Sequence, residues 1–118
     1  AALANYLIGF TENGFTTSTS FHQPEDIKKY CSDFNYAFLS PVFDSITKKG
    51  YRGRGFDVHD MNHEVVALGG VDHTLIQTAS NMGYSSVGVL GAIWNNDDYL
   101  NSFLTVKNAC QNIVKLKV

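Results

Sequence analysis

The hydrophobic and polar positions of the chain predict helices that alternate with short strands. Apolar residues first recur at the helical spacing i, i+3, i+4 and i+7, at Leu3, Tyr6, Leu7 and Phe10. Similar apolar stripes predict helices over residues 2–13, 24–34, 72–83 and 98–114. Runs that are apolar, or rich in Thr and Phe, predict strands over residues 15–21, 36–43, 64–70 and 86–94. The chain is therefore expected to be an α/β domain.

Residues that commonly begin or end helices stand at the expected boundaries. Pro24 lies in the first turn of the second helix, where its missing N–H costs nothing. Asp72 is a plausible N-cap of the third helix, and the polar run that ends at Asp98 caps the last one. Gly14 and Gly83 are expected to end the first and third helices.

The strands are predicted to form a parallel sheet. Residues 36–39 are almost entirely apolar, which is typical of a strand covered on both faces. The strands end near Phe21, Phe43, Gly69 and Gly91, about one βα unit apart, which favours parallel strands joined by right-handed crossovers. Four βα units are half of a (β/α)8 TIM barrel, and an open four-stranded sheet would leave two apolar edges unprotected. We therefore predict that residues 1–118 form the C-terminal half of one barrel domain, whose first four strands lie elsewhere.

Composition and charge exclude several classes of partner. The formal net charge is −2, so there is no general electrostatic attraction to nucleic acid or to an anionic membrane. No apolar run in the sequence approaches the length of roughly 20 residues that a helix needs to cross a bilayer. We also expect no signal peptide, because the sequence begins without a basic region and without a cleavage pattern. Cys31 and Cys110 occupy apolar positions of predicted helices, where reduced and buried thiols are expected. These features predict a cytoplasmic protein.

The residue types expected of a phosphate site gather where the predicted strands end. Hydroxyl groups and an ammonium suit a phosphate or pyrophosphate, and glycines let backbone N–H groups approach a ligand. The candidates are Ser20 and His22 after the first strand, Ser45, Thr47 and Lys48 after the second, Gly69 and Gly70 after the third, and Leu90 and Gly91 at the fourth. The alternatives are an ordinary polar surface loop and tight glycine turns.

Histidines and cations near these ends allow further interpretations. His22 would sit beside Ser20 at a strand mouth as a general acid or base, or it would simply cap the helix that begins at Pro24. His59 and His63 are spaced i, i+4, but without a third ligand a solvated turn is favoured over a metal site. The cations around residues 48–54 are expected to form either a lid over an anionic substrate or a flexible solvated loop.

Four strand-end motifs together resemble those of thiamin phosphate synthase and its thiazole tautomerase relatives. The motifs are Ser20-Phe-His22, Ser40-Pro-Val-Phe-Asp-Ser-Ile-Thr-Lys48, Ala67-Leu-Gly-Gly-Val71 and Val89-Leu-Gly-Ala-Ile93. The resemblance extends over nearly the whole chain. It implies a (β/α)8 barrel in which hydroxymethylpyrimidine pyrophosphate and thiazole phosphate join, with Mg²⁺, to give thiamin phosphate and pyrophosphate.

The resemblance also implies a role for each candidate residue. Ser20 would lie near the reacting pyrimidine and the pyrophosphate, and Lys48 would neutralise the charge that builds on the departing pyrophosphate. Ser45 and Thr47 would hold the thiazole phosphate region. Backbone N–H groups at Gly70, Leu90 and Gly91 would hold the phosphate itself. The Mg²⁺ ligands are expected in the N-terminal half of the barrel, so no metal ligand is predicted in this chain.

The chain departs from the synthase pattern Gly-Pro-x-Phe-Pro-Thr-x-Thr-Lys at Ser40, Asp44 and Ser45. Ser45 keeps a hydroxyl, whereas Asp44 adds an anion beside the predicted anion site. The tautomerase branch tends to lose hydroxyls in this loop and relies on a histidine at the position of His22. The hydroxyls and Lys48 favour the synthase, and His22 does not discriminate.

Two other hypotheses remain open. One is a thiazole tautomerase-like isomerase in which His22 moves the proton. The other is a non-catalytic phosphate-binding half-barrel, completed by self-association into a homo-oligomer that covers the exposed strand edges. All three hypotheses share phosphorylated small molecules as ligands.

Overall fold

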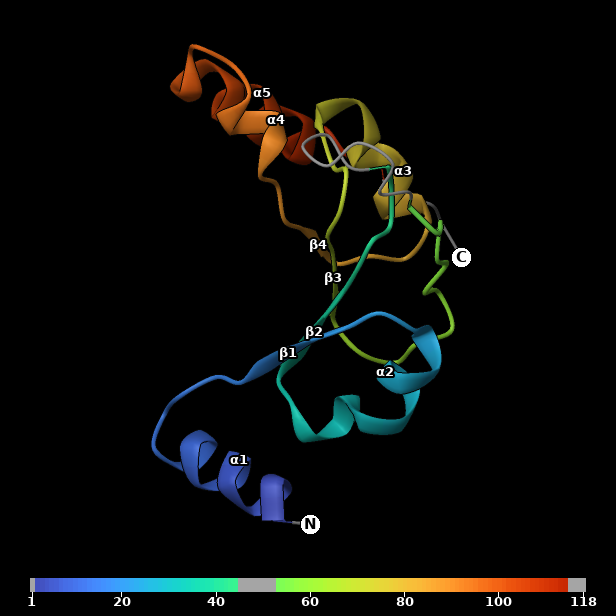
Figure 1. Cartoon of the computed structure of the whole chain (residues 1–118), viewed down its shortest axis with the longest axis vertical. Helices are drawn as coiled ribbons and strands as arrows, with labels where there is room; N and C mark the ends of the chain where they lie inside the picture. The colour runs from blue at the N-terminus through green and yellow to red at the C-terminus, as the bar shows by residue number, and fades with distance from the viewer. Residues whose placement is uncertain (1, 45–52, 115–118) are drawn as a thin grey trace.

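The computed structural model describes residues 2–44 and 53–114 (Figure 1). Its strands are β1 (Ser18–Phe21), β2 (Tyr36–Leu39), β3 (Val65–Ala67) and β4 (Ser86–Val87). Its α-helices are α1 (Ala2–Glu12), α2 (Pro24–Tyr30), α3 (Ile76–Asn81), α4 (Gly91–Trp94) and α5 (Tyr99–Gln111). Two 3₁₀ turns complete the elements, η1 (Cys31–Asp33) and η2 (His73–Leu75). The predicted alternation of strands and helices is confirmed.

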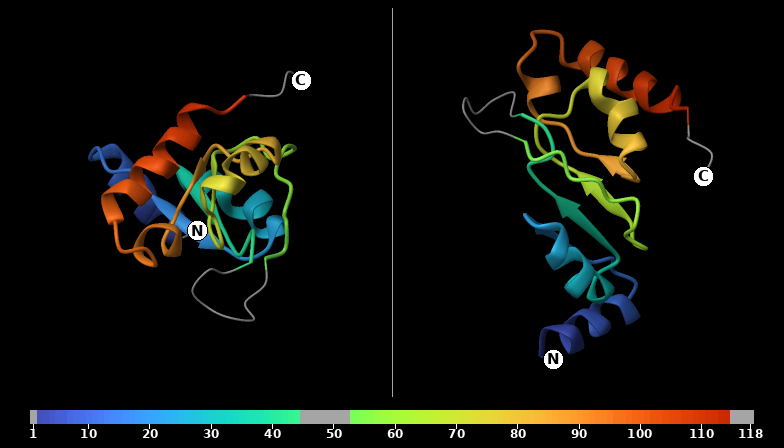
Figure 2. Two further views of the ribbon diagram at one scale, coloured as in Figure 1. Left: turned by 90° about the horizontal axis from the view of Figure 1, so that it is seen from above. Right: turned by 90° about the vertical axis from the view of Figure 1, so that its right-hand side faces the viewer.

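The strands form one parallel sheet in the order β1-β2-β3-β4, as predicted (Figure 2). The register places the last residues of all four strands in one row, because Phe21 pairs with Leu39, Leu39 with Ala67, and Ala67 with Val87. Parallel strands that end in register bring the loops that follow them to one edge of the sheet. This edge is called the strand mouth below.

One face of the sheet forms the core. Ala37, Leu39, Val65 and Ala67 alternate with less buried neighbours and are almost completely enclosed. The core cluster joins this face to Ile27 of α2, Ile76 and Ala79 of α3, and Val106 of α5. Burying each of the Leu, Ile and Val side chains in this layer contributes roughly 1.5–3 kcal/mol to stability.

The prediction that the second strand is covered on both faces is wrong for the described part of the chain. Tyr36 and Phe38 point to the face opposite Ala37 and Leu39 and are only half-buried. Their rings contact each other edge to face, with centroids 5.5 Å apart. The apolar composition of β2 therefore reflects two apolar faces, of which the helices bury one.

The predicted helix boundaries are largely confirmed. Gly14, with φ +87°, ends α1, and the Phe15 N–H donates to the Phe10 carbonyl at 3.1 Å. The Asp72 carboxylate accepts from the Thr74 N–H at 2.8 Å, and that of Asp98 accepts from the Asn101 N–H at 3.0 Å. Gly83, with φ +98°, follows α3. These ends depend on neighbouring residues alone, which explains why the sequence predicts them.

The strands are shorter than predicted. Phe15 contacts Phe10 edge to face at 6.1 Å instead of extending β1, and β2 ends at Leu39 before Pro41, which has no N–H to donate. The sequence predicts a fourth strand over residues 86–94, but the strand ends at Val87, and residues 91–94 form α4. After the Gly88 N–H donates to the Ala67 carbonyl at 2.8 Å, the chain leaves the sheet and turns into this helix.

The prediction of reduced cysteines holds, whereas burial holds only in part. Cys31 and Cys110 are both free thiols. Cys31 is half-buried against the core, but Cys110 is exposed on α5. The apolar stripe of α5 is therefore only partly covered by the described residues.

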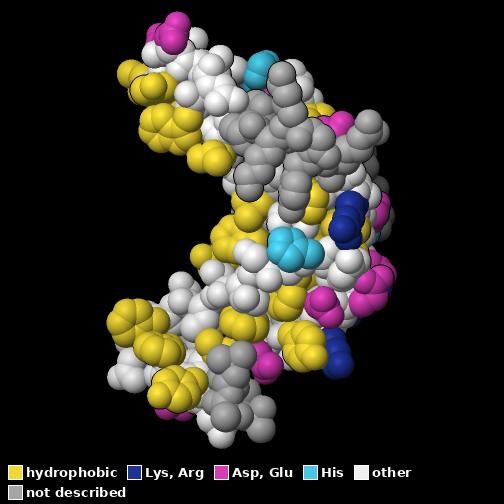
Figure 3. All heavy atoms as spheres, viewed as in Figure 1, with side chains coloured by type: hydrophobic (Ala, Val, Ile, Leu, Met, Phe, Trp, Pro, Cys, Tyr) yellow, Lys and Arg dark blue, Asp and Glu magenta, His cyan; other side chains and the backbone are white. Residues whose placement is uncertain are grey.

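Hydrophobic side chains remain exposed at both ends of the sheet. Figure 3 shows them gathered over α1 and over α4 and α5, on either side of a hollow in the molecule. They include Tyr6, Phe10, Phe15, Trp94, Leu100 and Phe103. Strands β1 and β4 are the two edges of the described sheet. None of the helices in the described ranges is long and apolar enough to cross a membrane.

Candidate functional site at the strand mouth

The first group at the strand mouth is the side chain of His22, which directly follows β1. Its Nδ1 lies 2.9 Å from the Ser40 carbonyl oxygen and 3.3 Å from Ser40 Oγ. Ser40 is the corresponding first residue after β2, and its N–H donates to the Phe21 carbonyl at 3.1 Å. The ends of β1 and β2 thus hold His22 and Ser40 in contact, while the His22 side chain stays exposed.

The second group is the Gly69-Gly70 turn after β3, where both residues have positive φ, +97° and +68°. A Cβ at Gly69 would lie 2.8 Å from Pro41 Cα, and one at Gly70 would overlap the Asp44 carbonyl. The Phe43 N–H also donates to the Gly69 carbonyl at 3.0 Å. The sequence predicts that another group lies close to the backbone of these glycines. In this structure that group is the backbone of the loop that follows β2. Their contact with a ligand stays a prediction.

The loop after β2 leaves and returns beside the same mouth. The Arg54 N–H donates to the Pro41 carbonyl, and the Gly55 N–H to the Val42 carbonyl, both at 2.9 Å. The Asp44 carboxylate accepts from the Gly53 N–H at 3.0 Å. These bonds join the two ends of the loop beside the glycine turn, and Asp44 and Arg54 are both exposed.

Leu90 and Gly91 lie at the start of α4. The carbonyl of Leu90 accepts from the N–H groups of Ile93 and Trp94, at 3.2 and 3.0 Å. Gly91 is buried, whereas the Leu90 side chain is 64% exposed. The structure thus places both residues after the fourth strand, as predicted, although in a helical turn.

Ser20 lies within β1, in register with Phe38 of β2. Because side chains alternate along a strand, Ser20 points to the face opposite the buried row of Leu39 and Ala67. It is exposed there, one residue before the mouth. The remaining candidates Ser45, Thr47 and Lys48, together with Lys49 and Arg52 of the predicted lid, lie outside the described residues.

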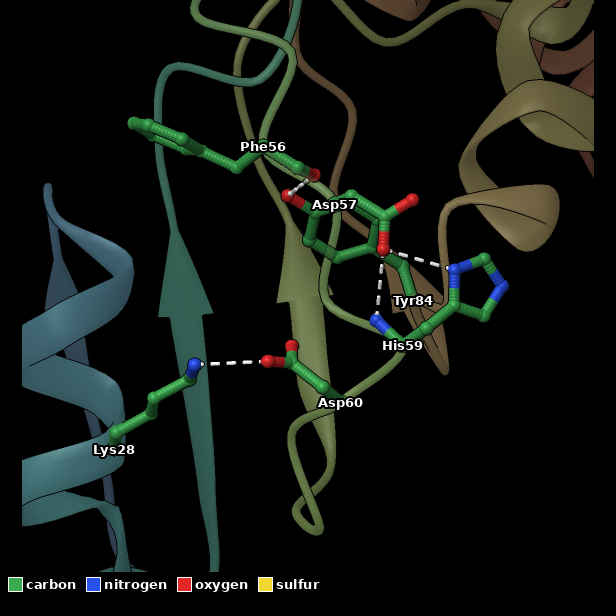
Figure 4. A network of polar contacts seen from close by, with 6 residues as sticks. All are labelled: Lys28, Phe56, Asp57, His59, Asp60 and Tyr84. Carbon is green, nitrogen blue, oxygen red and sulfur yellow. Dashed lines mark hydrogen bonds and ion pairs between the residues drawn. The ribbon is translucent and has the colours of Figure 1, made fainter.

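His59 and His63 are not brought together with a third ligand. His59 Nδ1 contacts the Asp57 carboxylate at 2.9 Å (Figure 4). The hydrogen bond that the His59 N–H donates to the Asp57 carboxylate, followed by this side-chain contact, lowers the pKa of Asp57. Nε2 of His63 is buried without a hydrogen-bond partner in the structure. Across residues 2–44 and 53–114, no group of three His, Cys, Asp or Glu side chains is arranged to hold a metal ion.

Sequence reasoning did not assign Ser40 to the site. The available signal was its position: Ser40 follows Leu39 as His22 follows Phe21, and those two strand ends pair in the sheet. Residues directly after paired parallel strands are neighbours, so the contact follows once the register is known.

Comparison with known proteins finds similarity in structure alone. No protein-family model matches the chain, and no curated protein matches it. Thiamine phosphate pyrophosphorylase from Pyrococcus furiosus superimposes with a TM-score of 0.74 and 15% identity, over 92% of this chain and 55% of that one. Thiamine phosphate pyrophosphorylase from Bacteroides thetaiotaomicron superimposes with a TM-score of 0.56 and 22% identity, over 80% of this chain and 52% of that one.

The chain has the fold of part of a thiamine phosphate pyrophosphorylase. It spans about half the length of each of these two proteins. The predicted resemblance is therefore confirmed at the level of the fold, as is the prediction that the chain forms part of a TIM-barrel-like α/β structure.

Proposed function

We propose that this chain is the C-terminal half of a thiamin phosphate synthase-like barrel and that its strand mouth binds the phosphorylated substrates. The reaction would join hydroxymethylpyrimidine pyrophosphate to thiazole phosphate, releasing pyrophosphate. The observation that carries the proposal is the convergence of His22, Ser40 and the Gly69-Gly70 turn at one edge of a sheet. That sheet has the fold of part of two thiamine phosphate pyrophosphorylases.

The proposed chemistry assigns different tasks to the loops around the mouth. In a chemical substitution reaction whose leaving group carries away several negative charges, the rate depends mainly on how well that developing charge is stabilised. We assign this task to Lys48, and the binding of the pyrimidine region to Ser20. Ser45 and Thr47 would bind the thiazole phosphate region. Backbone N–H groups of Gly69, Gly70, Leu90 and Gly91 would bind its phosphate, because oriented N–H groups complement an anion at no cost in side-chain entropy.

Mg²⁺ remains part of the proposal only for the complete barrel. Among the described residues, no three His, Cys, Asp or Glu side chains are grouped so that they could hold a metal ion. We therefore assign its binding to residues from the other half of the barrel and derive no step through it.

A thiazole tautomerase-like isomerase is the second candidate, favoured by the contact between His22 and Ser40. A histidine whose ring is held by a neighbouring group is suited to taking a proton from one atom of a ligand and returning it to another. In this alternative the same mouth binds a thiazole phosphate, and Lys48 has no leaving group to stabilise.

A coupling assay separates these two functions. The chain, alone and extended through strands one to four of the barrel, is mixed with both substrates and Mg²⁺, and thiamin phosphate is measured by chromatography. The proposal predicts product from the extended protein and a loss of about 10²–10³ in rate for Lys48→Ala. Lys49→Ala, which removes an equal charge one residue away, should keep most of the rate.

Other results of this assay would contradict the proposed function. The proposed function is contradicted if the well-folded extended protein gives no product. It is also contradicted if Lys48→Ala and Lys49→Ala react at equal rates. Tautomerisation that survives Lys48→Ala in the absence of coupling would favour the isomerase.

The exposed apolar surface supports a third candidate, a phosphate-binding half-barrel completed by self-association. Two edge strands and the exposed aromatic groups of α1, α4 and α5 would be covered by a second copy. Light scattering tests this directly: a dimer that binds phosphate without turnover supports it, and a monomer at assay concentration contradicts it.

A further inference from the structure

We infer that Ser40 is a positioning residue whose backbone carbonyl fixes the tautomer of His22, so that Nε2 carries the lone pair that accepts a proton at the strand mouth. The inference rests on the proposed location of the site at this mouth. It deepens the isomerase candidate, in which His22 moves a proton, by naming the atom that exchanges that proton and the group that orients the ring.

The sheet itself fixes the relative positions of the two residues. Phe21 and Leu39 pair at the ends of β1 and β2, and the Ser40 N–H donates to the Phe21 carbonyl at 3.1 Å. That carbonyl belongs to the residue directly before His22. Ser40 is thus hydrogen-bonded to the residue that precedes His22, and the placement of both residues depends on rigid strand ends.

Nδ1 of His22 contacts two groups of Ser40. The chemistry of these groups decides whether Nδ1 carries the proton of the neutral ring. The Ser40 carbonyl oxygen is 2.9 Å away and Ser40 Oγ is 3.3 Å away. A carbonyl can only accept, so a bare Nδ1 at 2.9 Å would direct its lone pair at the lone pairs of the oxygen. A hydroxyl adapts, because it either donates or accepts. The shorter and less adaptable contact therefore requires the proton on Nδ1.

A proton on Nδ1 leaves the lone pair of the neutral ring on Nε2. When Nε2 takes a proton from a bound substrate, the ring becomes an imidazolium whose Nδ1–H still donates to Ser40. The ring then returns the proton from the same Nε2 without rotating. A base held by a third group in this way is the arrangement used by other acid–base sites. It would serve substrates that must lose a proton at one atom and regain one at another.

The test is the tautomer of His22 measured by NMR without ligand, so that it does not depend on turnover. The chain is labelled with ¹⁵N in histidine, and long-range proton–nitrogen spectra are recorded at a pH where the ring is neutral. His22→Asn, whose side-chain amide can still donate to Ser40, assigns the His22 signals by their disappearance. We expect a protonated Nδ1 and an unprotonated Nε2. His73, which is exposed on η2, serves as the internal comparison and should show the mixture typical of a free ring.

Ser40→Ala separates the carbonyl from the hydroxyl, because it removes only Oγ. The inference predicts the same tautomer in this variant. An Nε2–H tautomer in the unmodified protein, or a change of tautomer in Ser40→Ala, would overturn it, since the hydroxyl would then orient the ring. Failure of the coupling assay alone would count against the proposed reaction and leave this result standing.

Discussion

Gly70 and the carbonyl of Asp44 are packed so closely that a Cβ at Gly70 would overlap the Asp44 oxygen. Gly70 also has φ +68°, a conformation that costs a side-chain-bearing residue about 1–2 kcal/mol. We predict that Gly70→Ala lowers the free energy of unfolding by this amount plus about 1–3 kcal/mol for the overlap. Denaturant titration measures the loss.

Gly55 is the matched control for that experiment. Its φ is +59°, yet nothing lies within 4 Å of a Cβ built on it. Gly55→Ala should therefore lower the free energy of unfolding by only the conformational cost, about 1–2 kcal/mol. Equal losses for the two variants would contradict the account in which the loop after β2 rests against the glycine turn.

Tyr84 links the segment before β4 to the segment that returns from the loop. Its hydroxyl donates to the Phe56 carbonyl at 2.8 Å, and burial, followed by the nearby Asp57 carboxylate, raises its pKa well above the ordinary value of 10.0. We predict that Tyr84→Phe costs about 1–2 kcal/mol at neutral pH, because the hydrogen bond is lost and the carbonyl loses its partner.

The raised pKa of Tyr84 also predicts an alkaline effect. A pKa that is higher in the folded state gives a stabilisation that is complete below pH 10 and is lost as the pH rises toward the folded-state value. Unfolding measured from pH 8 to pH 11 should therefore show a smaller alkaline loss for Tyr84→Phe than for the unmodified protein.

Lys28 and Asp60 form an ion pair at 2.9 Å between α2 and the segment before β3 (Figure 4). The hydrogen bond and charge of Lys28 lower the pKa of Asp60, so this stabilisation is present above about pH 4 and is lost as the pH falls through the folded-state pKa. Asp60→Asn should flatten the acid branch of the stability curve. The effect should be small and salt-sensitive, because both side chains are exposed.

Lys28→Met tests whether the acid effect belongs to this pair. It should flatten the acid branch as Asp60→Asn does, and the double variant should add nothing further. Additive changes would show that Asp60 titrates against another group.

Gln77 and Val114 exchange two hydrogen bonds that join α3 to the chain after α5. The Val114 N–H donates to Gln77 Oε1 at 2.9 Å, and Gln77 Nε2 donates to the Val114 carbonyl at 2.8 Å. We predict that Gln77→Ala lowers the free energy of unfolding by about 1–3 kcal/mol. Lys107→Ala, on the exposed side of α5, should change it by no more than about 0.5 kcal/mol. Similar losses in both variants would contradict this role for Gln77.

The sequence predicts those features that neighbouring residues determine. Asp72 and Asp98 cap their helices because each carboxylate reaches an N–H within three residues. Gly14 ends α1 for a similarly local reason, since its positive φ suits glycine.

Features that depend on distant partners are predicted less well. The apolar run at residues 89–94 suits a strand or a helix equally, and the turn away from the sheet after Gly88 makes residues 91–94 helical. Contact between Ser40 and His22 depends on the pairing of β1 with β2, and burial of Cys110 depends on what covers α5. Local patterns contain neither kind of information.

Binding of a phosphorylated ligand at the strand mouth underlies each of the proposed functions. The most direct test is titration of the ¹⁵N-labelled chain with thiazole phosphate, with inorganic phosphate as the comparison. We predict that the largest saturable amide shifts occur at Gly69, Gly70 and Gly91, and that thiazole phosphate binds more tightly than phosphate. Largest shifts around Asp57–Asp60, or no saturable shift at the mouth, would contradict the account.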